Sequence, residues 1–322
     1  MKRLGLTKRR PRRRAPSGDR SAFTLIDLLV TISIIATLGA VSITTVRSSI
    51  EAAREAQTET TIAKIDSVLT SIYERYQYLR LDMSDFEYVL SRDTTTPEGE
   101  KAKAKALRRV MRLRDLLRRD MPCTTNELGL GSEPEFWGGA NYYVGNEFTP
   151  LQDSYRLAVA NSAGFGDNYN AELLYLVVTN ADPESRAGFS DRDVADTDGN
   201  GLLEFVDGWG RPIWWMRWAP GLESSDRQPV LPLDPANAEL DADPFDPLAV
   251  SNGWFLVPYV FSAGPDGEYG LIAPTATDVV EMNDPFTAAL TYWTSGDYDL
   301  IPGYPNGDET HKDNIDNHTL VR

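Results

Sequence analysis

An uninterrupted apolar segment near the beginning of the chain limits what this sequence can fold into more than any other feature. Residues 23–46 read FTLIDLLVTISIIATLGAVSITTV and contain one ionisable side chain, that of Asp27. As an α-helix these 24 residues span roughly 36 Å, enough to cross a hydrocarbon core of about 30 Å. We therefore expect residues 23–46 to form a transmembrane helix segment.

Basic residues come directly before this segment. Residues 1–22 carry nine Lys and Arg residues and one acid, although the whole chain has a formal net charge of -16. Because positive flanks stay in the cytoplasm, we expect a single-pass protein of the inner (cytoplasmic) membrane, with its N-terminus inside and an extracytoplasmic C-terminal domain, periplasmic or exposed on a filament. A basic cluster can also bind nucleic acid, but the acidic remainder would repel phosphate, so we expect no nucleic-acid partner.

The helical pattern continues beyond the apolar segment. Between residues 23 and 96 there is no proline and the single glycine is Gly39. Apolar residues then recur at spacings of three and four, the pattern of one face of a helix: Ile62, Ile65, Leu69, Ile72, Tyr76 and Leu79. We expect one continuous helix from about residue 24 to residue 78, with an extension to Leu90 left open. A secretory signal peptide is the rival interpretation, but its apolar part is usually only 7–15 residues long and its cleavage would cut this helix.

The start of the apolar segment resembles the processing site of type IV pilins and type II secretion pseudopilins. Residues 22–29 read AFTLIDLL, and the family shows glycine, then Phe-Thr-Leu-Ile-Glu-Leu-Leu and an apolar helix. The resemblance implies that prepilin peptidase cleaves between Ala22 and Phe23, removes the basic cytoplasmic leader 1–22 and methylates the new amine of Phe23. It also implies assembly with other pilin or pseudopilin subunits, in a homo- or hetero-filament, on an inner-membrane platform.

Asp27 has two interpretations. A carboxylate in the middle of a spanning helix costs about 2.5–3.5 kcal/mol, and less near an end, where the side chain can reach the lipid interface. The resemblance implies instead that Asp27 pairs with the N-terminal amine of a neighbouring subunit during filament assembly. The chain departs from the family at Ala22, where glycine is usual, at Asp27, where glutamate is usual, and at Thr44, where many members have proline.

The remaining chain divides into two parts. Residues 47–120 should contain the amphipathic continuation and a second helix at 98–119, whose many Arg and Lys residues suggest a solvated face able to pair with acidic residues. Residues 121–322 should form an extracytoplasmic α+β pseudopilin-like domain with acidic loops. In this domain, residues 121–166 read as irregular loops, 170–179 as a short helix, and 211–218 and 254–264 as antiparallel strands. Cys123 is the only cysteine, which excludes an intramolecular disulfide.

One acidic loop has the spacing of a calcium-binding loop. Residues 196–207 read DTDGNGLLEFVD, and oxygen ligands at alternate positions around a turn glycine suit Ca²⁺. Asp takes the last position, where the EF-hand has Glu, so we call the segment EF-hand-like. An acidic turn without a metal is the alternative. The candidate ligands are Asp196, Asp198, Asn200, the carbonyl of Leu202, Glu204 and Asp207.

The segments 207–215, 261–270 and 312–318 (DGWGRPIWW, FSAGPDGEYG and KDNIDNH) resemble the C-terminal region of the type II secretion major pseudopilin. In that family a loop and a later acidic element hold a structural Ca²⁺. The resemblance implies that Asp266, Asp313 and Asp316 are side-chain ligands and that Ser262 offers its carbonyl. A plain β-turn at Gly-Pro-Asp-Gly is the alternative.

These features predict an α+β, pilin-like fold: a long N-terminal helix, membrane-spanning in its first half, packed on a small antiparallel sheet with loop insertions. The predicted function is that of a structural subunit of a type II secretion pseudopilus or a type IV pilus-like filament. The sequence has no Gly-x-Ser-x-Gly, no zinc-binding pair of histidines and no phosphate-binding glycine loop, so we expect no enzyme. The alternative is an unprocessed single-pass membrane-anchored extracytoplasmic binding or adhesin module.

Overall fold

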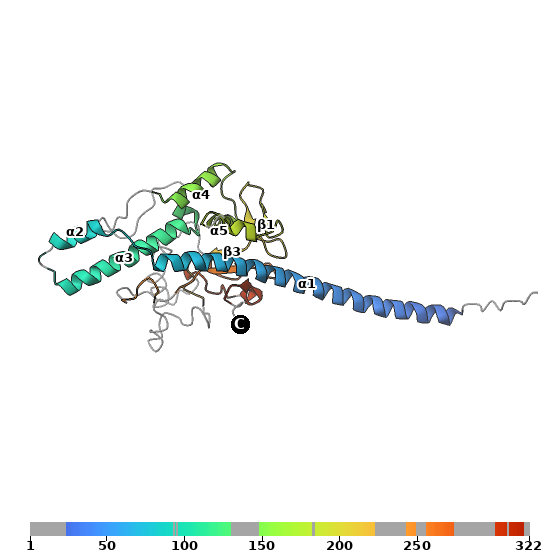
Figure 1. Cartoon of the computed structure of the whole chain (residues 1–322). Coiled ribbons are helices and arrows are strands. Elements are labelled where there is room, and N and C mark those ends of the chain that lie inside the picture. Colours follow the sequence, from blue (N-terminus) through green and yellow to red (C-terminus); the bar gives the residue numbers. More distant parts are fainter. Residues whose placement is uncertain are drawn as a thin grey trace, which may run out of the picture. The chain divides into compact units, whose positions relative to one another are not determined.

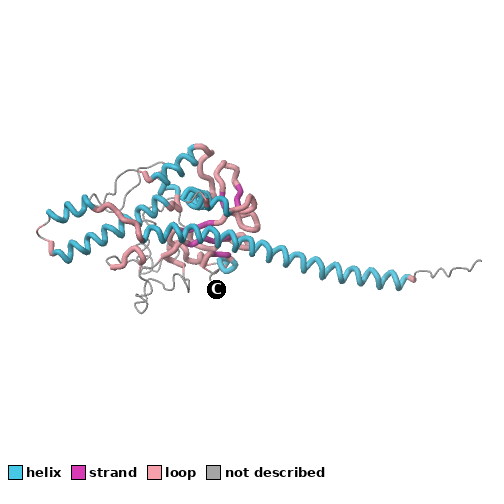
Figure 2. Tube along the Cα trace, in the orientation of Figure 1, coloured by secondary structure: helices cyan, strands magenta, loops and turns pink. Residues whose placement is uncertain are grey.

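The structure is a computed structural model, and it describes residues 24–92, 94, 96–129, 148–181, 184–222, 243–248, 256–273, 300–307 and 309–318. The chain forms two compact units, Met1–Ile50 and Glu51–Arg322. In the described part of the first unit there is one helix, whereas the second unit combines helices with two small antiparallel sheets (Figure 1, Figure 2). The fold is therefore α+β with a long N-terminal helix, as predicted.

The long helix, α1, covers Leu25–Gln77, so it begins in the first unit and ends in the second. These bounds confirm the prediction of one helix over residues 24–78. The extension to Leu90 is wrong, because residues 78–83 are not helical and a separate helix, α2, covers Ser84–Arg92. The described side chains of residues 24–50 are all exposed, and α1 is long and apolar enough to cross a membrane.

The second half of α1 supplies one face of the core of the second unit. Ile62, Ile65 and Leu69 are fully buried there, and Ile72 and Tyr76 follow on the same face. This is the stripe that the spacing of three and four predicts, because residues so spaced lie one above another on a helix.

Four further helical segments pack in the second unit: α3 (Glu98–Asp120), η1 (Thr125–Leu128), α4 (Pro150–Ala160) and α5 (Tyr169–Ala181). A short turn, η2 (Ser185–Gly188), follows α5. The helix predicted at 170–179 is confirmed as α5, whose Leu173, Leu174 and Val177 are fully buried. The prediction of irregular loops throughout 121–166 is wrong at α4. There Thr149 and Gln152 form a capping box, and proline occupies the first helical turn, which together favour helix initiation.

The strands are short and antiparallel. One sheet pairs β1 (Val194–Ala195) with β2 (Glu204–Phe205). The other has the order β3 (Trp214–Met216), β4 (Tyr259–Ser262) and β5 (Ile315–Asp316), which confirms the predicted pairing of 211–218 with 254–264. The turn η5 (Thr310–Asp313) leads into β5. Just after β5, Asn317 donates a hydrogen bond of 2.7 Å to Asp66 of α1, which joins the sheet to the helix.

The basic helix α3 is more buried than the sequence predicts. Arg108, Arg114, Arg118 and Arg119 are buried, so the interpretation of a solvated basic face is wrong for these four. Arg114 forms a buried ion pair with Asp243, and this contact confirms that the helix pairs with acidic residues elsewhere.

Candidate functional site

The cleavage position implied by the resemblance, between Ala22 and Phe23, lies outside the described residues. Asp27 lies in the first turn of α1, where its Oδ2 accepts hydrogen bonds from the backbone N–H (3.1 Å) and the hydroxyl (2.8 Å) of Thr24. The backbone N–H of Asp27 donates in return to the Thr24 hydroxyl, at 3.2 Å. This reciprocal arrangement is a capping box that satisfies N–H groups at the start of the helix. Asp27 therefore has a local structural role that the sequence reasoning missed.

The Asp-Gly-Trp-Gly turn lies against α1 within the second unit. The N–H of Gly208 donates to the Thr58 hydroxyl at 2.9 Å, and the Trp209 indole donates to Glu51 at 2.9 Å. A Cβ atom on Gly208 would overlap the backbone carbonyl of Arg54, so only glycine fits this close approach. The turn positions the helix against the loop that leads to β3.

A cluster of three carboxylates joins α5 to the β1–β2 hairpin. Glu172 on α5, Asp198 in the hairpin loop and Glu204 at the start of β2 each bring a carboxylate oxygen within 4.8 Å of the others. We call these three residues the acidic cluster. Glu172 and Glu204 are fully buried and Asp198 is exposed, so the cluster opens to solvent on one side. Among the described residues this is the one such group of acidic, His or Cys side chains able to hold a metal ion.

The two buried acids of the acidic cluster are only partly satisfied. Glu172 accepts a hydrogen bond from the Asn200 amide at 2.6 Å, and Glu204 accepts one from the N–H of Thr197 at 2.9 Å. Glu172 Oε2 and Glu204 Oε1 are buried without a hydrogen-bond partner. Burial, together with the charges of Asp198 and Glu204, raises the pKa of Glu172 to about 7. Burial likewise raises the pKa of Glu204.

The structure brings together only part of the predicted EF-hand-like loop. Asp198 and Glu204 join the acidic cluster, and the Asn200 amide contacts its edge. Asp196 instead accepts hydrogen bonds from three backbone N–H groups of the loop at 2.7–3.1 Å. Leu202 donates its N–H to Asn200, and Asp207 accepts from the Trp209 N–H and the Ser262 hydroxyl. Asp196 and Asp207 thus shape turns, while Glu172, which the loop template does not contain, joins Asp198 and Glu204 in a group able to hold a metal ion.

The second predicted calcium segment is partly assembled. Asp266 lies beside Asp313, to whose carboxylate its N–H donates at 3.2 Å, and the buried Oδ1 of Asn314 has no hydrogen-bond partner. These oxygens suit a hard cation. Asp316 has other contacts, accepting from the Tyr259 hydroxyl at 3.3 Å and the His318 N–H at 2.8 Å, and Ser262 is buried on β4. Calcium binding by this segment stays a prediction.

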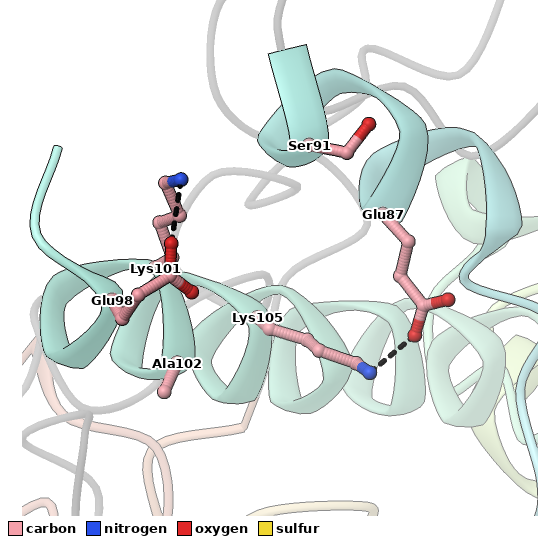
Figure 3. A pocket seen from close by; sticks show the side chains of 6 residues that line it. All are labelled: Glu87, Ser91, Glu98, Lys101, Ala102 and Lys105. Carbon is pink, nitrogen blue, oxygen red and sulfur yellow. Dashed lines mark hydrogen bonds and ion pairs between the residues drawn. The ribbon is translucent and has the colours of Figure 1, made fainter. Parts of the chain in front are cut away.

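A shallow pocket lies between α2 and α3 (Figure 3). Its charged side chains satisfy one another: Lys105 pairs with Glu87, and Lys101 pairs with Glu98 at 2.9 Å. No described residue there leaves an orphaned buried polar atom, so the pocket offers little to bind a ligand selectively.

The chain was compared with models of protein families, with curated proteins and with solved structures. None of the three comparisons gives a match. The function of the chain must therefore be inferred from its own residues and their arrangement.

Glu172 is the site residue that sequence reasoning missed. It sits in the apolar run NAELLYLVVT, whose helical character was predicted but whose single acid was given no role. A lone carboxylate inside a buried apolar helix is unusual and informative, because such a group needs a partner. The single acid in an apolar helix was therefore the signal that the sequence offered. The sequence does not show that the hairpin loop would supply the other carboxylates.

Proposed function

We propose that this chain is a membrane-anchored structural subunit of a helical filament, either a type II secretion pseudopilus or a type IV pilus-like filament. The observation that carries the proposal is the continuity of α1. One helix of 53 residues joins an exposed apolar half to a half that forms the core of the second unit.

The exposed apolar half needs a non-aqueous environment. Large side chains such as Leu25, Ile35 and Leu38 are 81%, 69% and 63% exposed. Removing apolar surface from water contributes about 25 cal/mol per Å², so lipid or other apolar helices will cover this segment. In the proposed cycle, lipid covers it first, with the basic residues 1–22 on the cytoplasmic side, and equivalent helices of other subunits cover it in the filament.

Asp27 supplies the charge that filament assembly would use. Its carboxylate lies at the beginning of the apolar helix, where it caps the first turn and is close enough to the helix end to meet a positive group. After cleavage between Ala22 and Phe23, the new amine of Phe23 in one subunit would neutralise Asp27 in its neighbour. Two groups that are costly in lipid then become tolerable together.

The first test is intact mass and N-terminal sequencing of the chain after co-expression with a prepilin peptidase. A new N-terminus at Phe23 with one added methyl group supports the proposal. A chain that keeps residues 1–22 overturns processing at this position and favours the unprocessed anchored module. A cut near residues 40–45 identifies a secreted protein and overturns the filament.

The second test separates the two roles of Asp27. Asp27→Asn keeps a side-chain oxygen to accept from Thr24 but removes the charge, whereas Asp27→Glu keeps the charge. We expect Asp27→Asn to insert in membranes normally and to fail in filament assembly, and Asp27→Glu to assemble. Thr24→Val, which weakens the capping box, is the control for helix capping. If Asp27→Asn assembles as well as the unchanged chain, charge pairing is not the role of this residue.

A further inference from the structure

The acidic cluster of Glu172, Asp198 and Glu204 carries more negative charge than its surroundings compensate. Two of its carboxylates are fully buried, and each has one oxygen without a hydrogen-bond partner. Within the described part of the chain, no Lys or Arg forms an ion pair with any of the three acids. Buried polar atoms in folded proteins nearly always have a partner, so an orphaned carboxylate oxygen needs an explanation, and a bound cation is one.

We propose that the acidic cluster binds a hard divalent cation of the Ca²⁺ class, which fastens the 196–204 loop to α5. Carboxylate oxygens are the ligands that Mg²⁺, Ca²⁺ and Mn²⁺ prefer. Three protein carboxylates favour Ca²⁺ over Mg²⁺, because Mg²⁺ dehydrates reluctantly and rarely occupies dedicated all-protein sites. The exposed side at Asp198 gives the ion a path from solvent and room for water ligands.

The surrounding backbone prepares the acidic cluster for an ion. Asp196 holds the loop in a tight turn through its backbone N–H bonds, and this orients Asp198 toward α5. The Asn200 amide donates to one oxygen of Glu172 and, at 3.2 Å, to one oxygen of Asp198, which leaves the second oxygen of Glu172 for a ligand. Gly166 borders the site, where a Cβ would overlap Asp198 Oδ2.

The inference is independent of filament assembly, because the acidic cluster lies wholly within the second unit and involves no residue of the membrane-spanning half of α1. It also differs from the predicted EF-hand-like site, since Glu172 of α5 replaces Asp196 and Asp207 of the loop as a ligand.

The test is calorimetric titration of the detergent-solubilised full chain, freed of metal with EDTA and dialysed, with CaCl₂. Because Asp266 and Asp313 belong to a second predicted calcium site, the informative quantity is the difference in bound Ca²⁺ between variants. Glu172→Gln and Glu204→Gln should each lose one equivalent of bound Ca²⁺, or weaken its binding by about tenfold or more. Asp167→Asn is the matched control: Asp167 is exposed, next to Gly166 and outside the acidic cluster, so its loss should change neither stoichiometry nor affinity.

A second, charge-neutral variant guards against misfolding. Gly166→Ala should displace the flexible Asp198 side chain, weaken Ca²⁺ binding and leave the apo fold intact. Unchanged stoichiometry and affinity in Glu172→Gln and Glu204→Gln would overturn the proposal, as would a chain that binds none of Ca²⁺, Mg²⁺ and Mn²⁺ at millimolar concentration.

Thermal unfolding separates a metal ligand from a structural hydrogen-bond acceptor. In EDTA, Glu172→Gln should unfold at or above the temperature of the unchanged chain, because it removes uncompensated charge. With Ca²⁺ the unchanged chain should gain stability through binding to the folded state, and the variant should not. If Glu172→Gln lowers the unfolding temperature equally in EDTA and in Ca²⁺, the residue serves only as an acceptor and the proposal is wrong.

Discussion

Arg217 and Glu127 form an ion pair with two hydrogen bonds, and neither side chain is accessible to solvent. The guanidinium nitrogens lie 2.6 and 3.0 Å from the two carboxylate oxygens. Glu127 also accepts from the backbone N–H of Cys123 at 2.8 Å, and Arg217 donates to the carbonyl of Met121. The pair thus joins the segment after α3 to the residue that follows β3.

Replacing Glu127 by Gln should destabilise the fold strongly. The change leaves the guanidinium of Arg217 buried without a counter-charge, and breaking a buried pair in this way costs about 3–5 kcal/mol. Urea unfolding of the detergent-solubilised chain, followed by tryptophan fluorescence, measures the loss. The control is Glu98→Gln, because Glu98 pairs with Lys101 at an exposed position, where a pair contributes at most about 1 kcal/mol. Equal effects of the two substitutions would contradict the prediction.

Gly208→Ala should detach the turn from α1. The added methyl group would overlap the Arg54 backbone, which cannot move without bending the helix, and such overpacking costs about 1–3 kcal/mol. The expected result is a lower urea midpoint and a change in near-ultraviolet circular dichroism as Trp209 loses its contact with Glu51. Gly99→Ala is the control, since Gly99 lies in α3 with open space around it and should gain helix stability. A Gly208→Ala variant as stable as the unchanged chain would show that the turn is not packed closely against α1.

The single thiol should be unreactive in the folded protein. Cys123 is fully buried, and burial raises the pKa of its thiol to about 12. Since the thiolate is the reactive species, iodoacetamide at pH 8 should label the chain only after denaturation. Mass spectrometry before and after urea treatment measures this, and a Ser91→Cys variant provides an exposed thiol as a positive control. Rapid labelling of the native Cys123 would contradict its burial.

The thiol of Cys123 should also make the stability of the folded protein depend on pH in the alkaline range. The folded state keeps the thiol of Cys123 protonated between its ordinary pKa of 9.0 and about 12, whereas the unfolded chain releases the proton. Stability therefore falls as pH rises through this range, because the unfolded state binds fewer protons. Buried tyrosines such as Tyr155, whose pKa is also raised by burial, add to the loss above pH 10.0. Between pH 9 and 10 the Cys123→Ala variant should show a shallower decline; identical slopes would exclude the thiol as the cause.

Asn170 should be irreplaceable at the start of α5. Its amide donates to the carbonyls of Cys123 (3.0 Å) and Trp215 (2.9 Å), and its oxygen accepts from the N–H of Trp215 (2.8 Å). Asn170→Ala leaves these three buried backbone groups unsatisfied, at about 1–3 kcal/mol for each group left without a partner. Asn170→Asp keeps the acceptor but turns a buried carboxylate oxygen toward the two carbonyls, so in urea unfolding it should be at least as destabilising as Asn170→Ala. If Asn170→Ala leaves the free energy of unfolding unchanged, water has replaced the amide.

Local patterns predicted much of this fold. The stripe from Ile62 to Tyr76 identified the buried face of α1, and β-branched and aromatic residues identified β3 and β4. Helix α4 was missed because the surrounding Gly- and Asn-rich composition outweighed the capping signal of Thr149 and Gln152. The burial of Arg114 was missed because its partner, Asp243, is 129 positions away in the sequence and comes near only on folding. The carboxylates of the acidic cluster come from two elements that are adjacent only in space, so loop spacing predicted Asp198 and Glu204 and could not reveal Glu172.

The hydrogen bond between Asp66 and Asn317 sets an order of events during synthesis. The two residues are 251 positions apart, which a ribosome adding roughly 5–20 residues per second covers in roughly 13–50 s. Until residue 317 has been added, α1 lacks this hydrogen bond to the segment after β5, although β3 and β4 have already been synthesised. The link between α1 and the end of the three-stranded sheet can therefore form only after every helix and strand between them has been synthesised.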